Sequence, residues 1–378
     1  MTQINSVRKS RGVLVWLLTA GGMLSLAGCG ADDDRADASA RGDVAPAPVG
    51  RVVVYAASSD AQARSIAGVF EQRSGVEVLL VSGDGGALAD RLVGEAASPR
   101  ADVWWSADPL ATAGLAPSSA LGVFVASDAQ ADFGGGWPTV HRAADDTWYG
   151  FGLRYRVLAV GREVESPPRT LRDLAEPRWS GRIGMARPTE GDALAHLAVL
   201  VGLWGDAPVR SWLSAMEQNG LRLFESEEAV VRAVGTGEID VGITSTGAAG
   251  VGENGVAWIW EVNEIGVGGG VSAPRSPETV PPLSAFGPVT LPSTIGRVSG
   301  GPNEAEARAL IEFVLSDDGE RLLLGGSAGL APLRPTLAAE ASAALLAGDA
   351  PDAYIPDWSE VLESADAAEG LAREVLGL

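Results

Sequence analysis

The sequence predicts an α/β protein with parallel sheets, arranged in two lobes. Three observations lead to this expectation. Short apolar runs of strand length, at Val52–Ala56, Val76–Val81 and Ala101–Ser106, are separated by stretches whose apolar residues recur at helical spacing. The same alternation of strand and helix returns between about residues 183 and 246. The chain has 378 residues, so the part beyond residue 51 is too long for one small domain.

Polar or small residues follow each strand of the first unit. Ser58 and Ser59 come after the first strand, the glycine-rich turn 83–86 after the second, and Asp108 after the third. In open parallel sheets, ligands bind beyond the carboxyl ends of the strands. We therefore expect one edge of a binding site at these three turns.

The next segment links the two lobes. Trp148–Val160 is a long strand-like run that ends the first lobe and crosses into the second. Beyond it, the turn Pro188–Asp192 follows a short apolar strand, and Ser245-Thr246 follow another. Strands and a helix from residue 289 onward return the chain to the first lobe. The expected division is a leader over 1–28, a tether over 29–50, a first lobe over 51–153 and 286–335, a second lobe over 154–285, and C-terminal helices over 336–378.

The amino terminus is typical of an exported lipoprotein. Arg8, Lys9 and Arg11 precede an apolar stretch that is too short for a stable membrane anchor. The stretch ends in Leu26-Ala27-Gly28-Cys29, an order that resembles the bacterial lipobox, in which the cysteine becomes the first mature residue and carries lipid. The alternative is an ordinary secretion signal with a chance cysteine. Cys29 is the only cysteine in the chain, so no internal disulfide is possible.

The charge excludes one class of partner. The formal net charge is −21, and removal of the leader would make it three units more negative. Nucleic-acid binding requires a basic face, so this composition argues against it. It also argues against electrostatic attraction to anionic lipid, which leaves the lipid on Cys29 as the membrane anchor. We expect the mature protein on the periplasmic face of the cell envelope, as a monomer.

Signatures of enzymes are scarce. Gly325–Gly329 matches G-x-S-x-G around Ser327, but a helix rather than a strand precedes it, and a glycine-rich helix end explains the pattern. The chain has two histidines, His141 and His196, and no HExxH, His/Cys cluster or Walker loop. We expect no enzymatic activity. A secreted hydrolase using Ser327 is one alternative, and a structural surface lipoprotein with an empty cleft is another.

Two turns favour the binding of a polar ligand. Ser82–Ala87 and Pro188–Asp192 each place small polar residues where a strand meets the start of a helix. Free backbone N–H groups and the helix dipole at such positions favour anions or ligand oxygens. Because the two turns belong to different lobes, they predict a ligand cleft between them.

Several stretches together resemble a known family. They include ADVWWSAD, SGRIGMARP, GEIDVGIT and a PLRP turn, and the similarity runs from Val52 to about Pro335. The sequence resembles the bacterial extracellular solute-binding proteins of ABC importers, most closely the ferric-iron, thiamine and phosphonate group. This resemblance implies a periplasmic-binding-protein type II fold, in which two α/β lobes with mixed or parallel sheets close on a solute about a β hinge. It also implies delivery of the solute to an ABC permease.

The resemblance also implies a set of ligand-binding positions. Arg154 and Arg156 lie where the family often has an arginine near a bound anion. The other positions are at strand ends and helix starts. The full set is Ser58, Ser59, Gly85, Gly86, Ala87, Ala107, Asp108, Arg154, Arg156, Thr189, Glu190, Thr244, Ser245 and Thr246.

One departure from the family bears on the solute. Ferric-iron binders usually have adjacent tyrosines where this chain has Ser245-Thr246, and hydroxyls are weaker Fe³⁺ ligands than phenolates. The expected solute is therefore Fe³⁺ with a carried anion, helped by Asp108 and Glu190, or a small oxyanion or phosphonate. The oxyanion better fits the helix starts and arginines, and no cofactor is expected. One of Trp104 and Trp105 should face the core, which leaves the other for stacking on a ligand.

Overall fold

The computed structural model describes residues 50–57, 60–126, 133, 137–248, 256–260, 263–264, 285–326, 329–340 and 353–378. The predicted leader, Cys29 and most of the tether lie outside these residues, as do Ser58, Ser59 and Ser327. None of the described helices is long and apolar enough to cross a membrane.

The first lobe is built on three parallel strands. β1 (Gly50–Ala57) lies between β2 (Val76–Ser82) and β3 (Val103–Ser106) and pairs in parallel with both. β12 (Thr290–Val298) adds to this sheet antiparallel to β3. Along β1, Val52 and Val54 pack into one apolar cluster and Tyr55 into another, so helices cover both faces of the sheet. These helices are α1 (Asp60–Ser74), α2 (Gly85–Gly94), α3 (Pro109–Ala113), α7 (Glu304–Val314) and α8 (Asp317–Gly326).

One long strand belongs to both lobes. The first half of β5 (Tyr149–Gly161) pairs antiparallel with β12, up to Tyr155 opposite Thr290. Its second half pairs antiparallel with β8 (Val241–Ser245) and β9 (Val256–Trp260). The strand order is β2-β1-β3-β12-β5-β8-β6-β7. The predicted two-lobed α/β fold is confirmed, while the residue boundaries of the lobes stay a prediction.

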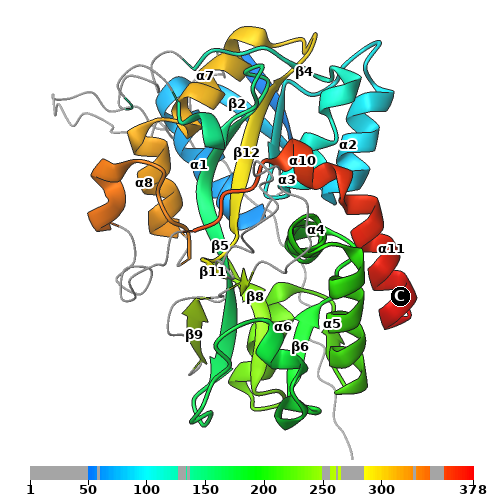
Figure 1. Ribbon diagram of the computed structural model, residues 1–378. Helices are drawn as coiled ribbons and strands as arrows, with labels where there is room; N and C mark the ends of the chain where they lie inside the picture. Colours follow the sequence, from blue (N-terminus) through cyan, green and yellow to red (C-terminus); the bar gives the residue numbers. More distant parts are fainter. Residues whose placement is uncertain are drawn as a thin grey trace, which may run out of the picture. The chain divides into compact units, whose positions relative to one another are not determined.

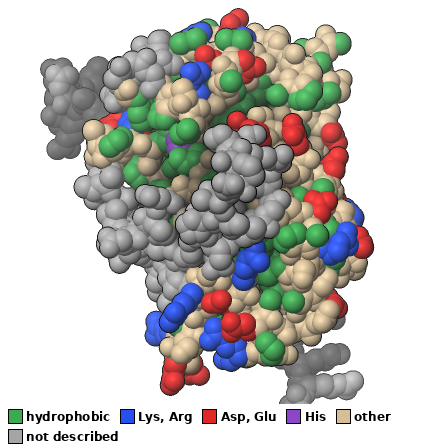
Figure 2. Space-filling model, in the orientation of Figure 1, with side chains coloured by type: hydrophobic (Ala, Val, Ile, Leu, Met, Phe, Trp, Pro, Cys, Tyr) green, Lys and Arg blue, Asp and Glu red, His purple; other side chains and the backbone are tan. Residues whose placement is uncertain are grey.

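The second lobe repeats the parallel arrangement. β6 (Ile183–Ala186) lies between β7 (Arg222–Phe224) and β8 and pairs in parallel with both. The ion pairs Arg182–Asp240 and Arg222–Glu238 belong to this lobe. In the lower part of the space-filling view, basic and acidic side chains lie next to one another (Figure 2). Its helices are α4 (Gly191–Trp204), α5 (Asp206–Gln218) and α6 (Glu227–Gly235).

The C-terminal helices touch both lobes. α10 (Trp358–Glu363) packs against α3 and α4, and α11 (Ala365–Leu376) packs against α4 and α5 (Figure 1). Trp358 and Leu371 are buried in the same apolar cluster as residues of both lobes. Shorter elements complete the described chain: β4 (Leu121–Gly122), β10 (Asn263–Glu264), β11 (Ala285–Phe286) and 3-10 turns at Ala116–Ser118, Thr139–His141, Arg172–Ala175, Pro177–Trp179 and Pro335–Glu340.

A buried ion pair anchors the segment that follows α8. Arg334, 1% exposed, donates from Nη1 to Glu320 Oε2 at 3.0 Å and from Nη2 to the Leu315 carbonyl at 2.6 Å. The Leu333 N–H donates to the other oxygen of Glu320. The guanidinium also lies 5.4 Å from the centre of the Trp137 ring. This anchoring fixes the chain next to Leu330, which lines the cleft described below.

We expect Glu320→Ala to lower the free energy of unfolding by about 3–5 kcal/mol, because it leaves a buried guanidinium without its counter-charge. Urea denaturation followed by tryptophan fluorescence measures the change. The matched control is Glu217→Ala, which removes an exposed helical glutamate and should change stability by less than about 0.5 kcal/mol. Equal effects of the two substitutions would contradict the role of the buried pair.

Candidate ligand-binding cleft

A cavity of about 470 Å³ lies where the strand ends of the two lobes meet. Its described lining combines Ala107, which follows β3, with the start of α4, the start of α6 and the end of β8. The volume is in the range of small-molecule sites. The lining residues are Gln62, Ala107, Arg154, Ala186, Arg187, Thr189, Glu190, Gly191, Asp192, Ala193, Glu225, Ser226, Glu227, Glu228, Ser245, Gly247, Ala248 and Leu330.

Both helix starts expected from the sequence are present. α2 begins at Gly85, and Asp84 caps it by accepting a hydrogen bond from the Ala87 N–H at 2.8 Å. A Cβ on Gly85 would lie 3.3 Å from the Ala111 side chain, so glycine lets α2 pack closely on α3. α4 begins after Glu190, whose side chain makes no capping bond to its own helix.

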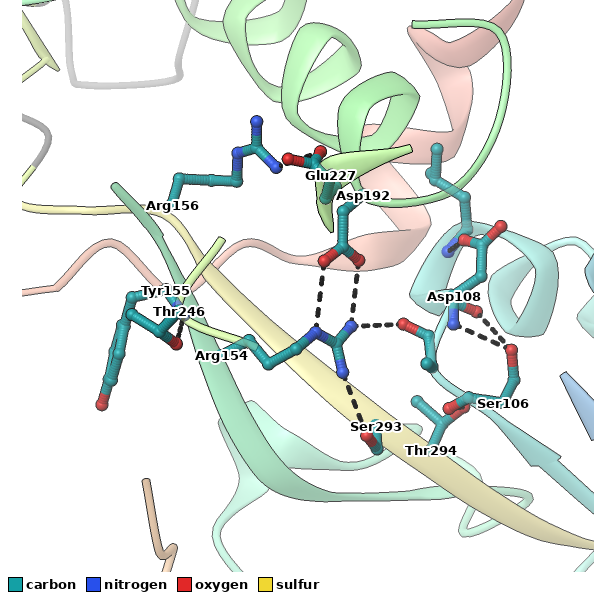
Figure 3. A network of polar contacts seen from close by, with 12 residues as sticks. Ser106, Asp108, Arg154, Tyr155, Arg156, Asp192, Glu227, Thr246, Ser293 and Thr294 are labelled. Atoms are coloured by element: carbon teal, nitrogen blue, oxygen red, sulfur yellow. Dashed lines mark hydrogen bonds and ion pairs between the residues drawn. The ribbon is translucent and has the colours of Figure 1, made fainter. Parts of the chain in front are cut away.

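Arg154 joins groups from three parts of the chain (Figure 3). Its Nε and Nη2 donate to the two carboxylate oxygens of Asp192, at 3.2 and 3.0 Å. Nη1 donates to Ser293 Oγ on β12 at 3.1 Å, and Nη2 also donates to the Ala107 carbonyl at 2.5 Å. Arg154 is 7% exposed. The first lobe therefore meets the start of α4, in the second lobe, at this one guanidinium.

The charge of Arg154 lowers the pKa of its partner, Asp192. Burial by itself would raise the pKa of the Asp192 carboxyl, but the charge and hydrogen bonds of Arg154 hold that pKa below its usual range. The charge of Arg156 and a hydrogen bond from Ser245 act in the same direction. Asp192 is therefore ionised at neutral pH and neutralises Arg154.

Arg156 is paired in the same way. It is fully buried, and its Nη1 donates to Glu227 Oε1 at 2.7 Å. Burial raises the pKa of Glu227; the neighbouring charge of Asp192 adds to the rise, and Arg156 opposes it. Arg187, on the cleft lining, pairs with Glu225 at 2.5 Å. The pairing of both crossing arginines with carboxylates weakens the expectation that they hold a free anion.

Two further carboxyl groups, next to the starts of α3 and α4, have shifted pKa values. Asp108 Oδ1 accepts from the N–H groups of Leu110 and Ala111, at 2.9 and 3.2 Å, and so caps α3. Burial, together with the charge of Asp192, raises the pKa of Asp108 to about 6. Glu190 lies near the carboxyl group of Asp84, in the turn after β2. Burial and this carboxyl neighbour raise the pKa of Glu190.

Comparison with known proteins identifies the family. Residues 52–325 match the family model for bacterial extracellular solute-binding proteins. The chain belongs to this family.

Relatives of this solute-binding protein include iron binders. The major ferric iron-binding protein of Neisseria meningitidis serogroup B is 27% identical over 293 residues, which cover 75% of this chain and 81% of the relative. The Fe(3+)-binding periplasmic protein of Serratia marcescens is 29% identical over 195 residues, or 51% and 56% of the two chains.

Solved structures agree on the fold. Iron-bound HitA from Pseudomonas aeruginosa matches with a TM-score of 0.70 and 25% identity, over 87% of this chain and 99% of that one. AfuA from Actinobacillus pleuropneumoniae, bound to fructose-6-phosphate, matches with a TM-score of 0.65 over 87% and 98%. At 18% identity it is evidence for the fold alone.

The end of β8 contributes less to the solute-binding cleft than its sequence indicated. Among Thr244, Ser245 and Thr246, only Ser245 lines the cavity. Thr246 Oγ1 accepts from the Tyr155 N–H at 3.2 Å and donates to the Gly329 carbonyl at 2.5 Å, so it joins three backbone segments. Thr244 is fully buried.

Of the other ligand-binding positions that the resemblance implies, some line the cavity and some do not. Ala107, Arg154, Thr189 and Glu190 line the cavity. Gly85, Gly86, Ala87, Asp108 and Arg156 surround it at the helix starts and on β5 without lining it.

The expectation of a stacking tryptophan on β3 is wrong. Trp104 is 0% and Trp105 is 1% exposed, and the two rings pack into apolar clusters on opposite faces of the sheet. Trp104 Nε1 donates to Thr112 at 2.8 Å. Alternation predicted the opposite directions correctly, but helices cover both faces, so neither ring reaches a ligand.

Sequence reasoning missed much of the acidic lining. Asp192 was inside a turn that the sequence marked, yet its pairing with Arg154 was not foreseen. The run Glu225–Glu228 directly follows β7, so the rule of polar residues after strand ends would have found it. In the described part of the lining there is no tyrosine, histidine or cysteine. The described residues also contain no cluster of three or more potential metal ligands among His, Cys, Asp and Glu.

We expect Asp108→Asn to stabilise the protein at pH 8 and to have little effect near pH 4. Because the folded-state pKa of Asp108 lies above its unfolded value, stability from this group is present at low pH and is lost as pH rises through about 6. Asparagine keeps the cap of α3 without a buried charge. Chemical denaturation between pH 4 and 8 measures the difference.

The control for this prediction is Asp357→Asn at the exposed cap of α10, where Asp357 Oδ1 accepts from the Ser359 N–H at 3.0 Å. It should give no comparable gain at pH 8. If Asp108→Asn were less stable than the native protein at every pH, the buried carboxylate would be stabilising and the interpretation would be wrong.

Proposed function

We propose that this protein is a lipid-anchored receptor of an ABC import system that captures a small solute in the cleft and delivers it to a membrane permease. The observation that carries the proposal is the cavity of about 470 Å³, which is lined by strand ends and helix starts of both lobes. Membership of a solute-binding family supports the same role, and this is a family of transport proteins rather than of enzymes. The anchor is the lipid on Cys29.

The lining favours a solute that contains a cation. Its described residues include five carboxylates, of which Asp192, Glu225 and Glu227 form ion pairs with arginines, while Glu190 and Glu228 lie outside these three pairs. Carboxylate oxygens are hard donors that suit hard cations. Similar proteins from Neisseria and Serratia are named for ferric iron. We propose Fe³⁺ as the transported ion.

A carried anion completes this proposal. Because the described lining has no tyrosine, Fe³⁺ would be bound as a complex whose own anion supplies the missing donors. The starts of α4 and α6 lie on the cleft and favour such an anion through their free N–H groups. The same helix starts support the second candidate, a small oxyanion or phosphonate without a metal.

The two candidates predict different thermal shifts. We expect ferric citrate or ferric phosphate to raise the melting temperature of the purified chain, by up to the equivalent of about 2.7 kcal/mol at a hundredfold excess over Kd. Citrate, phosphate and methylphosphonate alone should have little effect. A shift with a free anion alone would favour the second candidate. No shift with any of them, and no ligand detected by mass spectrometry of natively purified protein, would contradict a receptor function.

A substitution in the lining tests the iron proposal directly. Glu228→Gln removes an exposed carboxylate from the cavity wall, and we expect it to weaken binding of the ferric complex about tenfold, or ~1.4 kcal/mol. Glu217→Gln on α5, outside the cavity, is the matched control and should leave the affinity unchanged. Isothermal titration measures both, and equal affinities would show that the carboxylate takes no part.

The anchor has its own test. In a bacterial host we expect the full chain to fractionate with membranes and Cys29→Ser to be released into the soluble fraction, because the acceptor of the lipid is gone. Ser39→Ala, in the predicted tether, is the control. Membrane association that persists in Cys29→Ser would contradict the lipid anchor.

A further inference from the structure

The passage of β5 from one sheet to the other separates the two arginines of the crossing. Tyr155 is the last residue of β5 that pairs with β12, where it lies opposite Thr290. Arg156 begins the pairing with β8, where it lies opposite Ser245. Arg154 therefore belongs to the sheet of the first lobe, and Arg156 to the sheet of the second. When the lobes separate, the ion pairs of these two arginines are affected differently.

The Arg154–Asp192 ion pair crosses the boundary between the lobes. On the first-lobe side, Arg154 is held by Ser293 Oγ on β12 at 3.1 Å and by the Ala107 carbonyl at 2.5 Å. Its Nε and Nη2 reach the two carboxylate oxygens of Asp192, in the first turn of α4, at 3.2 and 3.0 Å (Figure 3). The two side chains are 9% and 15% exposed. Separation of the sheets has to break this buried two-point contact.

The Arg156–Glu227 ion pair stays within the second lobe. Glu227 is in the first turn of α6, which packs against β8, and Arg156 is paired with β8 as well. Arg156 Nη1 donates to Glu227 Oε1 at 2.7 Å. Both carboxylates, Asp192 and Glu227, line the same cavity. The two ion pairs are therefore alike in chemistry and surroundings and differ in whether they bridge the lobes.

The second lobe also encloses the aliphatic part of Arg154. Gly247 follows β8, and a Cβ on this residue would lie 2.4 Å from Arg154 Cδ. Four hydrogen bonds hold the guanidinium, so the side chain cannot move aside without losing some of them. With the lobes together there is room for glycine at this position and for no larger residue.

We propose that Arg154 and Asp192 form a latch between the lobes, which holds the empty cleft closed and so limits the entry of a solute. This inference rests on the proposed receptor function, since it concerns access to that cleft. Hydrogen bonds between ionised groups are about twice as strong as those between neutral groups, and opening the lobes exchanges them for water. The latch sets the fraction of molecules that are open to the solute, and the apparent affinity depends on that fraction.

The test measures the separation of the lobes without solute. Spin labels are attached to Asp90→Cys on α2 and Arg232→Cys on α6, both exposed positions, in the full chain carrying Cys29→Ser. Double electron–electron resonance with a chelator present gives the populations of short and long distances. We expect the short distance to dominate when the latch is intact.

Two substitutions should open the cleft for different reasons. Asp192→Asn removes the counter-charge of Arg154, and the guanidinium can then regain water only when the lobes separate. Gly247→Ala leaves both charges in place but adds a Cβ for which the closed cleft has no room. In each variant we expect the ratio of long to short distances to rise about tenfold, equivalent to ~1.4 kcal/mol.

Each substitution has a matched control. Glu227→Gln removes a carboxylate from the same cavity whose arginine lies in its own lobe, so it should keep the native distances. Gly370→Ala on α11 adds a Cβ that meets nothing within 4 Å and should also keep them. Far-UV circular dichroism checks that every variant is folded. Gly247→Ala decides alone if Asp192→Asn does not fold.

Native distances in either folded variant would overturn the latch, and so would equal opening in Glu227→Gln. Titration of the native chain with ferric citrate separates this inference from the receptor function. If the distances do not change but ferric citrate binds, the latch is wrong and the receptor stands. If the variants open but ferric citrate does not bind, the latch stands and the iron receptor is wrong.

Discussion

The buried guanidinium of Arg154 is the interaction on which the cleft depends. A buried arginine is stable only when its fixed fork of donors finds acceptors and a counter-charge. Here those acceptors are Asp192, Ser293 and the Ala107 carbonyl, from α4, β12 and the end of β3. Arg154 lies on β5, the strand that pairs with both sheets. Satisfying one side chain therefore brings three distant parts of the chain to the place where the lobes meet.

This requirement also determines the charge of the cleft. Each arginine near the crossing brings its own carboxylate, as in Arg154–Asp192 and Arg156–Glu227. The positive groups are neutralised within the protein, while Glu190 and Glu228 remain on the cavity wall. The two arginines of the crossing are therefore neutralised, and the described wall of the cavity keeps an excess of carboxylates.

The strands and helix starts could be predicted from sequence because their signals are local. The apolar run Val52–Ala56 and the glycine-rich turn 83–86 appear in the structure as β1 and the start of α2. The ion pairs inside the cleft could not be predicted from sequence, because Arg154 and Asp192 come together only when both lobes have formed. Likewise, the alternation of side chains along a strand predicted that Trp104 and Trp105 face opposite sides of the sheet. That α-helices cover both sides could be seen only in the structure. Of the positions that the resemblance implied, Ala107, Arg154, Thr189, Glu190 and Ser245 line the cavity, whereas lining residues such as Glu228 were identified only from the structure.

The fold itself leaves the choice of solute to a few side chains. Structures of this architecture hold iron in one case and fructose-6-phosphate in another. In this chain Thr246 is committed to the backbone around Tyr155 and Gly329, and Ser245 remains as the one hydroxyl of its strand end on the cavity. The turns after β6 and β7 supply the other polar groups. Asp192 and Glu227 in these turns pair with Arg154 and Arg156, but the other residues of the turns can change the ligand while the buried ion pairs of the crossing stay intact.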